Sequence, residues 1–263
     1  IPGFSTPARP QTIRNNVRWL RTVFDWAKTE REDGTILLFR NPWDGFRLPP
    51  ADKPNRPEMT QQLHDRVAAA APNWRMAEIM RICRAMGRRV NSVRHLALTD
   101  IDLQAGTVVW QAAYDKTHTT SVTPLRAAAK QAIRRALERR RMEGVEASRW
   151  LFPACRDQEN PVSCDTLNNW MRETKAKLGI KIRGLGYHGE KRALIRSSEF
   201  KRLRAKAAVE FVGTTYETMQ RVYDFVDLPE LQGAVTTLDR AATGRRSWRR
   251  PVVAVRYKAN GQK

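Results

Sequence analysis

Polar side chains that could do chemistry occur in one order along this chain. An arginine comes first, then a lysine, then a histidine beside two more cations, and finally a tyrosine. Taken singly, each has an ordinary explanation, such as a packed helix tyrosine or a solvated lysine in a turn. Their joint order and spacing indicate that together they form a functional site. The set is Arg89, Lys116, His188 with Lys191 and Arg192, and Tyr223.

Phosphoryl transfer through a tyrosine needs these residue types. Two fixed cations, preferably bidentate arginines, stabilise the charge that develops on the non-bridging oxygens of a phosphodiester under attack. A lysine can protonate the departing 5′ oxygen, and a histidine can accept or share the proton of the nucleophile. Because arginines carry the charge, the reaction requires no metal ion. The order therefore indicates Tyr223 as a candidate nucleophile.

The charge balance favours a polyanionic partner. The 263 residues include 48 Lys and Arg against 27 Asp and Glu, which gives a formal net charge of +21. This excess is far beyond what solubility requires and indicates binding to a polyanion, with DNA or RNA as the first candidates. A basic protein at a membrane surface is the alternative, but its cations would gather on one amphipathic helix.

Other classes of function lack their sequence signals. The three cysteines show no paired spacing, the four histidines form no zinc-type cluster, and no GxxxxGK[ST] phosphate loop occurs. No apolar run approaches the roughly 18–20 residues of a membrane span. We therefore expect a cytoplasmic protein that uses no metal ion or other cofactor. The chain begins at Ile1 rather than at a methionine, which is typical of a fragment or a processed chain.

The chain divides at a proline-rich segment. Residues 40–59 carry five prolines among polar residues, which is the composition of a linker. We place a partial helical DNA-binding domain at 1–50, the linker at 51–59, a catalytic domain at 60–227, and a C-terminal helix with a basic tail at 228–263.

The small domain contains a predicted amphipathic helix over residues 10–28. Apolar residues recur there every three or four positions, beginning at Ile13 and Val17, and arginines share another face. Arginines on such a face can bind DNA phosphates. The candidates for DNA contacts are Arg14, Arg18, Arg21 and Arg88.

The catalytic domain is expected to be mainly α with one small β-hairpin. Residues 106–114 and 120–125 are rich in β-branched and aromatic residues, and a polar turn that contains Lys116 separates them. Helices are predicted at 125–143, at 164–178, at 188–210 as one or two helices, and at 214–227.

With these residues in place, the chain resembles the tyrosine recombinases, or phage-type integrases, over roughly residues 8–226. The stretch MGRRVNSVRHLALTDIDL resembles the family's first arginine box, in which Gly-x-Arg precedes an Asp eleven residues after the arginine, and this identifies Arg89. The stretch YDKTHTTSVTPL resembles the hairpin that carries the family's lysine, here Lys116. The stretch FVGTTYETMQRVYDF resembles the last box, with Thr214 at its final position and Tyr223 nine residues beyond.

Three places depart from the family's pattern. Ser92 stands where Glu or Asp usually follows the first arginine by three residues, and Thr214 stands where His or Trp is usual. In YHGEKRA the arginine that normally follows His188 by three residues is replaced by Lys191, and Arg192 comes one position later. Either cation could hold the phosphate; we favour Arg192, because a bidentate fork suits a phosphate better than a point charge.

The resemblance implies a fold and a reaction. Two lobes, a helical core-binding domain and the catalytic domain, would clamp duplex DNA, and Tyr223 would form a 3′-phosphotyrosine link. Four protomers would act on two DNA sites to exchange strands. The helix expected at 228–242 would dock on a neighbouring protomer, with packing on its own core as the alternative.

Two other functions stay open. The altered boxes suit an architectural or regulatory DNA-binding protein that no longer cuts. A topoisomerase-like relaxing enzyme would use the same chemistry at a single site without strand exchange. These residues do not indicate the target sequence, the direction of recombination or any accessory protein.

Overall fold

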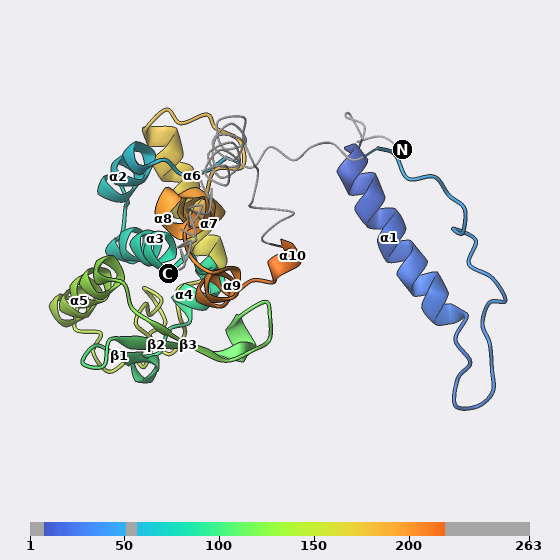
Figure 1. The fold of residues 1–263 in the computed structure, drawn as a ribbon, viewed down its shortest axis with the longest axis horizontal. Coiled ribbons are helices and arrows are strands. Elements are labelled where there is room, and N and C mark those ends of the chain that lie inside the picture. The colour runs from blue at the N-terminus through green and yellow to red at the C-terminus, as the bar shows by residue number, and fades with distance from the viewer. Residues whose placement is uncertain (1–7, 51–56, 219–263) are drawn as a thin grey trace, which may run out of the picture. The chain divides into compact units, whose positions relative to one another are not determined.

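The computed structural model describes residues 8–50 and 57–218 (Figure 1). Two compact units divide the chain between residues 56 and 57, within the predicted linker. The roles assigned to the domains stay predictions. Of the helix predicted at 214–227, the structure describes residues 214–218, which contain the three-residue helix α10 (Tyr216–Thr218). Tyr223, the helix expected at 228–242 and the basic tail lie outside the described residues.

Unit 1 is built around one long helix, α1 (Pro10–Ala27), which confirms the predicted amphipathic helix. Proline suits its first turn, because the missing N–H would have no partner there anyway. Val17 and Ala27 are buried, whereas Trp19 and Trp26 are 67% and 62% exposed. The apolar face of α1 is therefore only partly covered within the described residues.

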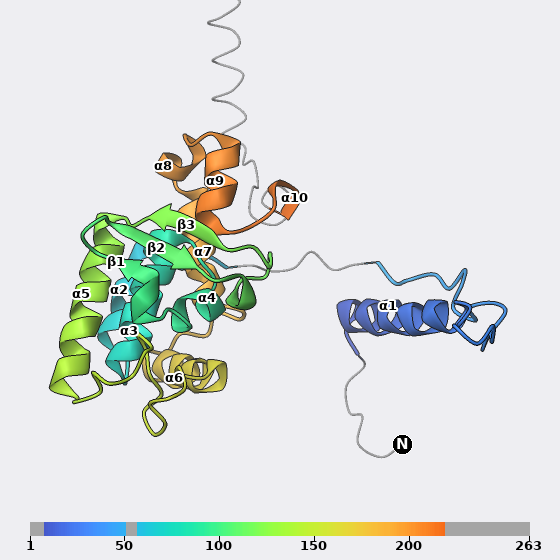
Figure 2. The ribbon, with the colours of Figure 1, turned by 90° about the horizontal axis from the view of Figure 1, so that it is seen from below.

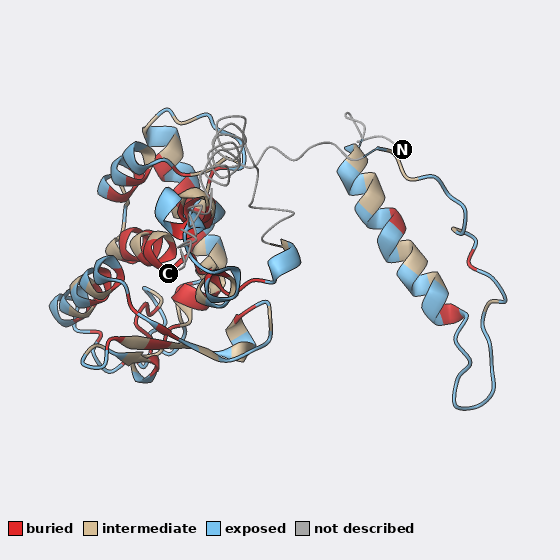
Figure 3. Ribbon diagram, in the orientation of Figure 1, coloured by how far each residue is buried: buried red, intermediate tan, exposed pale blue. Residues whose placement is uncertain are grey.

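Unit 2 is organised around the buried helix α3 (Trp74–Met86). Asn73 begins it, since its side-chain oxygen accepts a hydrogen bond from the Arg75 N–H at 3.0 Å. Gly87 ends it in the left-handed conformation, with φ of 62°. Most residues of α3 are buried (Figure 3), so neighbouring elements must surround it.

Four other helices pack directly on α3 (Figures 1 and 2). They are α2 (Gln61–Ala69), α4 (Val90–Arg94), α5 (Ala127–Met142) and α7 (Tyr187–Arg196). A further helix, α6 (Cys164–Lys177), contacts α2 and α3. The helices predicted at 125–143 and 164–178 are thus confirmed as α5 and α6.

Three short helices follow α7, namely α8 (Ser198–Lys201), α9 (Ala205–Val212) and α10 (Tyr216–Thr218). The region 188–210 therefore holds three helices, α7, α8 and α9, rather than the one or two expected. Ser197 causes the extra break, because its backbone is extended and its hydroxyl caps α8 by accepting from the Phe200 N–H at 3.3 Å.

A small antiparallel sheet completes unit 2. Its strands, in sheet order, are β1 (Ile101–Asp102), β2 (Thr107–Trp110) and β3 (Ser121–Pro124). The predicted hairpin is confirmed as β2 and β3, and β1 is an addition. Alternate residues of β2 are buried in the core shared with α3 and α5, and Trp110 Nε1 donates to Thr123 Oγ1 at 2.8 Å. The fold is mainly α with a small sheet, as predicted.

Within the described residues, no helix is long and apolar enough to cross a membrane.

Candidate active site

The first arginine of the predicted set lies at the junction of α3 and α4. Gly87 turns the chain after α3, and Arg89 is the residue that precedes the first turn of α4. Its Nη1 donates to the carbonyl oxygen of Gly213 at 3.0 Å, and 16% of its side chain remains exposed. A cation thus sits at the surface of the core, within reach of solvent and of the segment that precedes the tyrosine.

Arg88 points the other way, into the protein. Its Nε donates to the Phe211 carbonyl at 2.8 Å, its Nη2 to the Glu210 carbonyl at 2.7 Å, and its Nη1 lies 3.2 Å from Asp115 Oδ2. The guanidinium also lies over the Trp110 ring. Burial lowers its pKa to about 10, although the charge of Asp115 opposes this shift. Arg88 is 2% exposed, so we leave it out of the DNA contacts that we propose.

Lys191 is also directed inward. It is fully buried, and its Nζ donates to the Val212 carbonyl at 2.6 Å, with the Gly213 carbonyl at 3.5 Å. Burial and the positive charges of Arg89 and Arg88 hold its pKa well below the usual range. This placement favours Arg192 over Lys191 as the phosphate-binding cation, but the choice stays a prediction.

Three cations therefore meet at the C-terminal end of α9, where backbone carbonyls lack helical partners and the helix dipole is negative. We call Arg88, Arg89 and Lys191 the α9 clasp. The carbonyls that they bind belong to Glu210, Phe211, Val212 and Gly213. The clasp joins the arginine box and the histidine box to the segment that leads to Tyr223.

His188 lies in the first turn of α7, with its side chain at the surface. Partial desolvation by the surrounding protein lowers its pKa, and the positive charges of Arg192, Arg89, Lys191 and Lys116 lower it further. All the cations of the predicted set thus act on this one imidazole. The neutral ring that results is the form that can accept a proton.

Arg192 is half-buried, and its guanidinium donates a hydrogen bond to the Pro57 carbonyl. This bond links α7 to the first residue of unit 2. After desolvation, the charge of Arg192 is the largest cause of the lowered pKa of His188.

Lys116 is exposed in the loop between β2 and β3, as predicted from the hairpin. In the part of the chain that the structure describes, its ammonium makes no hydrogen bond or ion pair. A long side chain that extends from a fixed loop can reach the 5′ oxygen of a bound phosphodiester.

Asp115 is a member of the site that the sequence did not single out. It is 3% exposed, and its carboxylate lies 3.2 Å from Arg88 Nη1 and 3.9 Å from Arg89 Nη1. The residue stands directly before Lys116, and that adjacency was its only sequence signal. An aspartate in a polar turn is normally solvated, so burial could not be foreseen.

Thr214 is buried next to the clasp, at 6% exposure. Its N–H donates to the Val209 carbonyl at 3.3 Å. Among the described residues its hydroxyl oxygen has no hydrogen-bond partner. A buried hydroxyl in this state can donate to an incoming oxygen, such as one of a phosphate.

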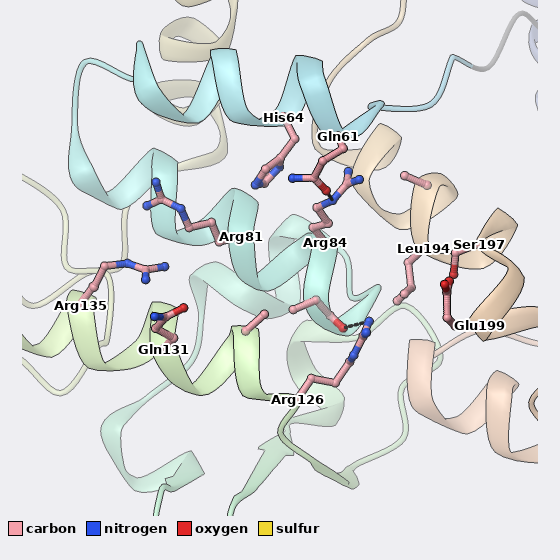
Figure 4. A pocket seen from close by; sticks show the side chains of 13 residues that line it. Gln61, His64, Arg81, Arg84, Arg126, Gln131, Arg135, Leu194, Ser197 and Glu199 are labelled. Atoms are coloured by element: carbon pink, nitrogen blue, oxygen red, sulfur yellow. Dashed lines mark hydrogen bonds between the residues drawn. The ribbon is translucent and has the colours of Figure 1, made fainter.

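A separate cavity of about 520 Å³ lies among α2, α3, α5 and α7 (Figure 4). Four arginines line it, namely Arg81, Arg84, Arg126 and Arg135. Three of them are held by buried carboxylates: Glu78 pairs with Arg81 and Arg135, and Glu190 pairs with Arg84. Of the active-site residues that the structure describes, none lines this cavity.

Of the three arginines of α1 that are predicted to contact DNA, two donate hydrogen bonds to backbone carbonyls and one is exposed. Arg18 is exposed. Arg14 donates to the Pro49 carbonyl at 2.6 Å, and Arg21 donates to the carbonyls of Trp43 and Phe46. Arg14 and Arg21 thus hold the segment that follows the helix, and their contacts with DNA stay predictions.

Sequence comparison decides the family. Residues 56–208, more than half of the chain, match the profile described as the phage integrase family. The chain belongs to the phage integrase family. No curated protein sequence matches it.

Solved structures of this integrase-family fold superpose on the chain. The Tn1549 transposon integrase in complex with a circular intermediate DNA gives a TM-score of 0.67 at 14% identity, over 87% of this chain and 79% of that one. A lambda integrase dimer bound to a COC′ core site gives 0.61 at 18% identity, over 83% and 63%. The XerA recombinase gives 0.55 at 18% identity, over 69% and 65%, so the chain spans just under two thirds of XerA.

At such identities the likeness shows the fold alone. It confirms the predicted fold, and the family match over residues 56–208 confirms the predicted resemblance.

Proposed function

We propose that this integrase-family chain is a site-specific DNA recombinase that cuts and rejoins duplex DNA through a 3′-phosphotyrosine link. The observation that carries the proposal is that the arginine box and the histidine box meet at one carbonyl: Arg89 and Lys191 lie 3.0 and 3.5 Å from the Gly213 oxygen, directly before the buried Thr214. The charges of Arg89, Lys116, Lys191 and Arg192 also lower the pKa of the nearby His188. A surface with so many cations around one neutral base suits a phosphodiester better than a carboxylate or a sugar.

In the cleavage step, the Tyr223 oxygen forms a bond to the scissile phosphorus while the bond from phosphorus to the 5′ oxygen breaks. His188 accepts the proton of the tyrosine, and Lys116 gives a proton to the departing 5′ oxygen. Arg89 and Arg192 hold the non-bridging oxygens, and the Thr214 hydroxyl adds one uncharged hydrogen bond. The phosphotyrosine conserves the bond energy, so rejoining by a 5′ hydroxyl reverses the step without ATP.

Strand exchange between two sites follows if four protomers assemble on two duplexes, as the family resemblance implies. We place the reaction in the cytoplasm, on the DNA of a bacterial host or of a mobile element. The Tn1549 integrase structure is a complex with a circular intermediate DNA, and the lambda integrase dimer is bound to a core site, which supports DNA as the partner here.

A second candidate is a DNA-binding protein on the same scaffold that no longer cuts. Two observations favour it: Thr214 carries no charge where the family usually has His or Trp, and Lys191 is turned into the interior. Loss of these contributions slows the chemistry and leaves binding to duplex DNA intact.

Covalent trapping tests the proposal. The full chain is mixed with a pool of nicked duplexes from the ends of the element that encodes it, and adducts are sought on denaturing gels. We expect an adduct with the wild type and none with Tyr223→Phe. An adduct that persists in Tyr223→Phe assigns the nucleophile to another residue. Tight binding by the wild type without any adduct supports the non-cutting protein instead.

A further inference from the structure

We infer that Asp115 is a positioning residue for Lys116, and that it supplies from the hairpin the carboxylate that the arginine box lacks at Ser92. This inference rests on the proposed function, because it assigns Lys116 the protonation of the leaving oxygen. It adds a residue that acts on the reaction without touching DNA.

The Asp115 carboxylate binds on two sides. Oδ2 faces Arg88 Nη1 at 3.2 Å, and Oδ1 faces Arg89 Nη1 at 3.9 Å. Oδ1 also accepts from both the N–H and the hydroxyl of Thr117, each at 3.0 Å. One side chain therefore connects the arginine box with the residue that follows Lys116.

The backbone around Lys116 is closed by the same aspartate. The His118 N–H donates to the Asp115 carbonyl at 3.1 Å, which makes Asp115–His118 a hydrogen-bonded turn. His118 has a left-handed φ of 50°, a conformation uncommon for residues other than glycine. The backbone of Lys116 is thus held at both ends, whereas its side chain reaches into solvent.

The arginine box also holds the residue before Asp115. Ser92 Oγ and Asn91 Nδ2 both donate to the Tyr114 carbonyl, at 3.2 and 3.1 Å. The His95 ring stacks on the Tyr114 ring with centroids 3.9 Å apart. Ser92, which stands where the family usually has an acid, here binds the backbone of the hairpin, and the acid comes from the hairpin itself.

Charge explains why a carboxylate is needed at this place. The α9 clasp brings Arg88, Arg89 and Lys191 together at one helix end, and Asp115 is the carboxylate that lies against two of them, Arg88 and Arg89. Burial opposes its ionisation, but the hydrogen bonds from Thr117 and the charges of both arginines outweigh burial and lower its pKa. Asp115 is therefore a carboxylate at neutral pH. Its neutral amide analogue would leave the cations uncompensated and the turn weakly tied to them.

Loss of the Asp115 carboxylate should impair protonation of the leaving 5′ oxygen by Lys116. A general acid contributes on the order of 10²- to 10⁴-fold, and a misplacement of about 1 Å can cost roughly 10²-fold. We expect Asp115→Asn to slow cleavage by about 10- to 100-fold, because Lys116 would no longer stand over the 5′ oxygen.

The test replaces the 5′ bridging oxygen of the cut phosphate with sulfur, once covalent trapping has located that phosphate. A thiolate leaves without being protonated, so the sulfur substrate makes a general acid unnecessary. Adduct formation is timed on both substrates with the full chain. We expect Lys116→Ala and Asp115→Asn to be slow on oxygen and to return to within a few-fold of the wild type on sulfur.

The matched control is Asp102→Asn, which changes an exposed aspartate of the same sheet. Asp102 Oδ1 accepts from the Ala105 N–H at 2.7 Å in the other turn, far along the chain from Lys116. It should cleave both substrates at the wild-type rate. Should Asp115→Asn fail to fold, Thr117→Val removes one hydrogen bond to the same carboxylate, and a smaller loss with the same recovery on sulfur is expected.

The rates on the two substrates distinguish failure of the role inferred for Asp115 from failure of the role proposed for Lys116. If Lys116→Ala recovers on sulfur but Asp115→Asn stays equally slow on both substrates, Asp115 does not act through Lys116, and the inference is overturned. A wild-type rate for Asp115→Asn on oxygen overturns it as well. If Lys116→Ala itself is not recovered, the proposed role of Lys116 fails, and the inference fails with it.

Hydrogen exchange provides a readout that needs no cleavage. In the free protein, amides of residues 111–120 should exchange faster in Asp115→Asn than in the wild type or in Asp102→Asn. Equal exchange in all three proteins would show that the carboxylate does not hold the loop, even if no adduct were ever found.

Discussion

At the residue scale, the α9 clasp makes one glycine essential. Gly213 has a left-handed φ of 58°, and a Cβ built there would lie 2.9 Å from Asp115 Oδ2, 3.0 Å from Arg88 Cζ and closer still to Arg88 Nη1. The guanidinium cannot yield, because it is bonded to carbonyls on both sides. Gly213 is therefore required both by its backbone and by the space that it leaves.

We predict that Gly213→Ala lowers the free energy of unfolding by about 3 kcal/mol or more, because backbone strain and displacement of Arg88 add together. Gly179→Ala is the matched control, since Gly179 has a similar φ of 66° but nothing within 4 Å of its added Cβ. It should cost only about 1 kcal/mol from strain. Urea unfolding of the three proteins measures both; equal losses would show that Arg88 can move aside.

Sequence reasoning at this scale proposed the members of the site from their order and spacing, and that assignment stays a prediction. It could not tell which neighbouring arginine is buried. Arg88 and Arg89 are identical in type, and only the turn at Gly87 decides that the first points inward. Asp115 was missed for the same reason, because burial in a turn leaves no mark on a single sequence.

At the element scale, α7 matters most, because it carries His188, Lys191 and Arg192. Glu190 anchors it from within: this carboxylate is fully buried and binds His64 Nδ1 at 2.8 Å and Arg84 Nη1 at 3.0 Å. His64 comes from α2 and Arg84 from α3, which Figure 4 shows on adjacent helices. One carboxylate thus fixes α7 against two helices.

We predict that Glu190→Gln lowers the free energy of unfolding by about 3 kcal/mol, because it leaves a partly buried arginine without its counter-charge. Glu146→Gln is the control, since its pair with Arg141 has side chains that are 64% and 77% exposed, and its loss should cost less than about 1 kcal/mol. Thermal unfolding at neutral pH compares them. Similar losses from both substitutions would show that the buried network contributes nothing special.

Periodicity and turn residues predicted α1, α5, α6 and the β2–β3 hairpin correctly, whereas the central helix α3 was not singled out. The short elements were not predicted, because each is marked in the sequence by only one or two residues. Ser197 splits α7 from α8 with one hydroxyl, and β1 has only two residues, too few for an alternating pattern. Such elements are specified by tertiary contacts rather than by local propensity.

At the scale of the whole molecule, the charge of +21 should govern the proposed binding to DNA. Each phosphate that the protein neutralises adds about 0.9 to the slope of log affinity against log salt. Each phosphate contact from unit 1, such as one from the exposed Arg18, should therefore make the slope of log affinity against log salt steeper.

We predict that the full chain binds a duplex with a steeper salt dependence than the fragment 57–263, by about 0.9 for each phosphate that unit 1 neutralises. Arg18→Ala in the full chain should lower the slope by about one. Fluorescence anisotropy, measured over a several-fold range of salt concentration, gives the three slopes. Identical slopes for chain and fragment would place every phosphate contact in unit 2.

Under the proposed function, the α9 clasp also bears on the stage of synthesis at which the chain becomes able to cut DNA. Its arginines are synthesised early, but the carbonyls that hold them belong to residues 210–213, more than a hundred positions later. Domains fold as units while the ribosome releases them from the N-terminus onward. An unfinished chain thus has Arg88 and Arg89 without the carbonyls that hold them, and under the proposed function it should not cut DNA.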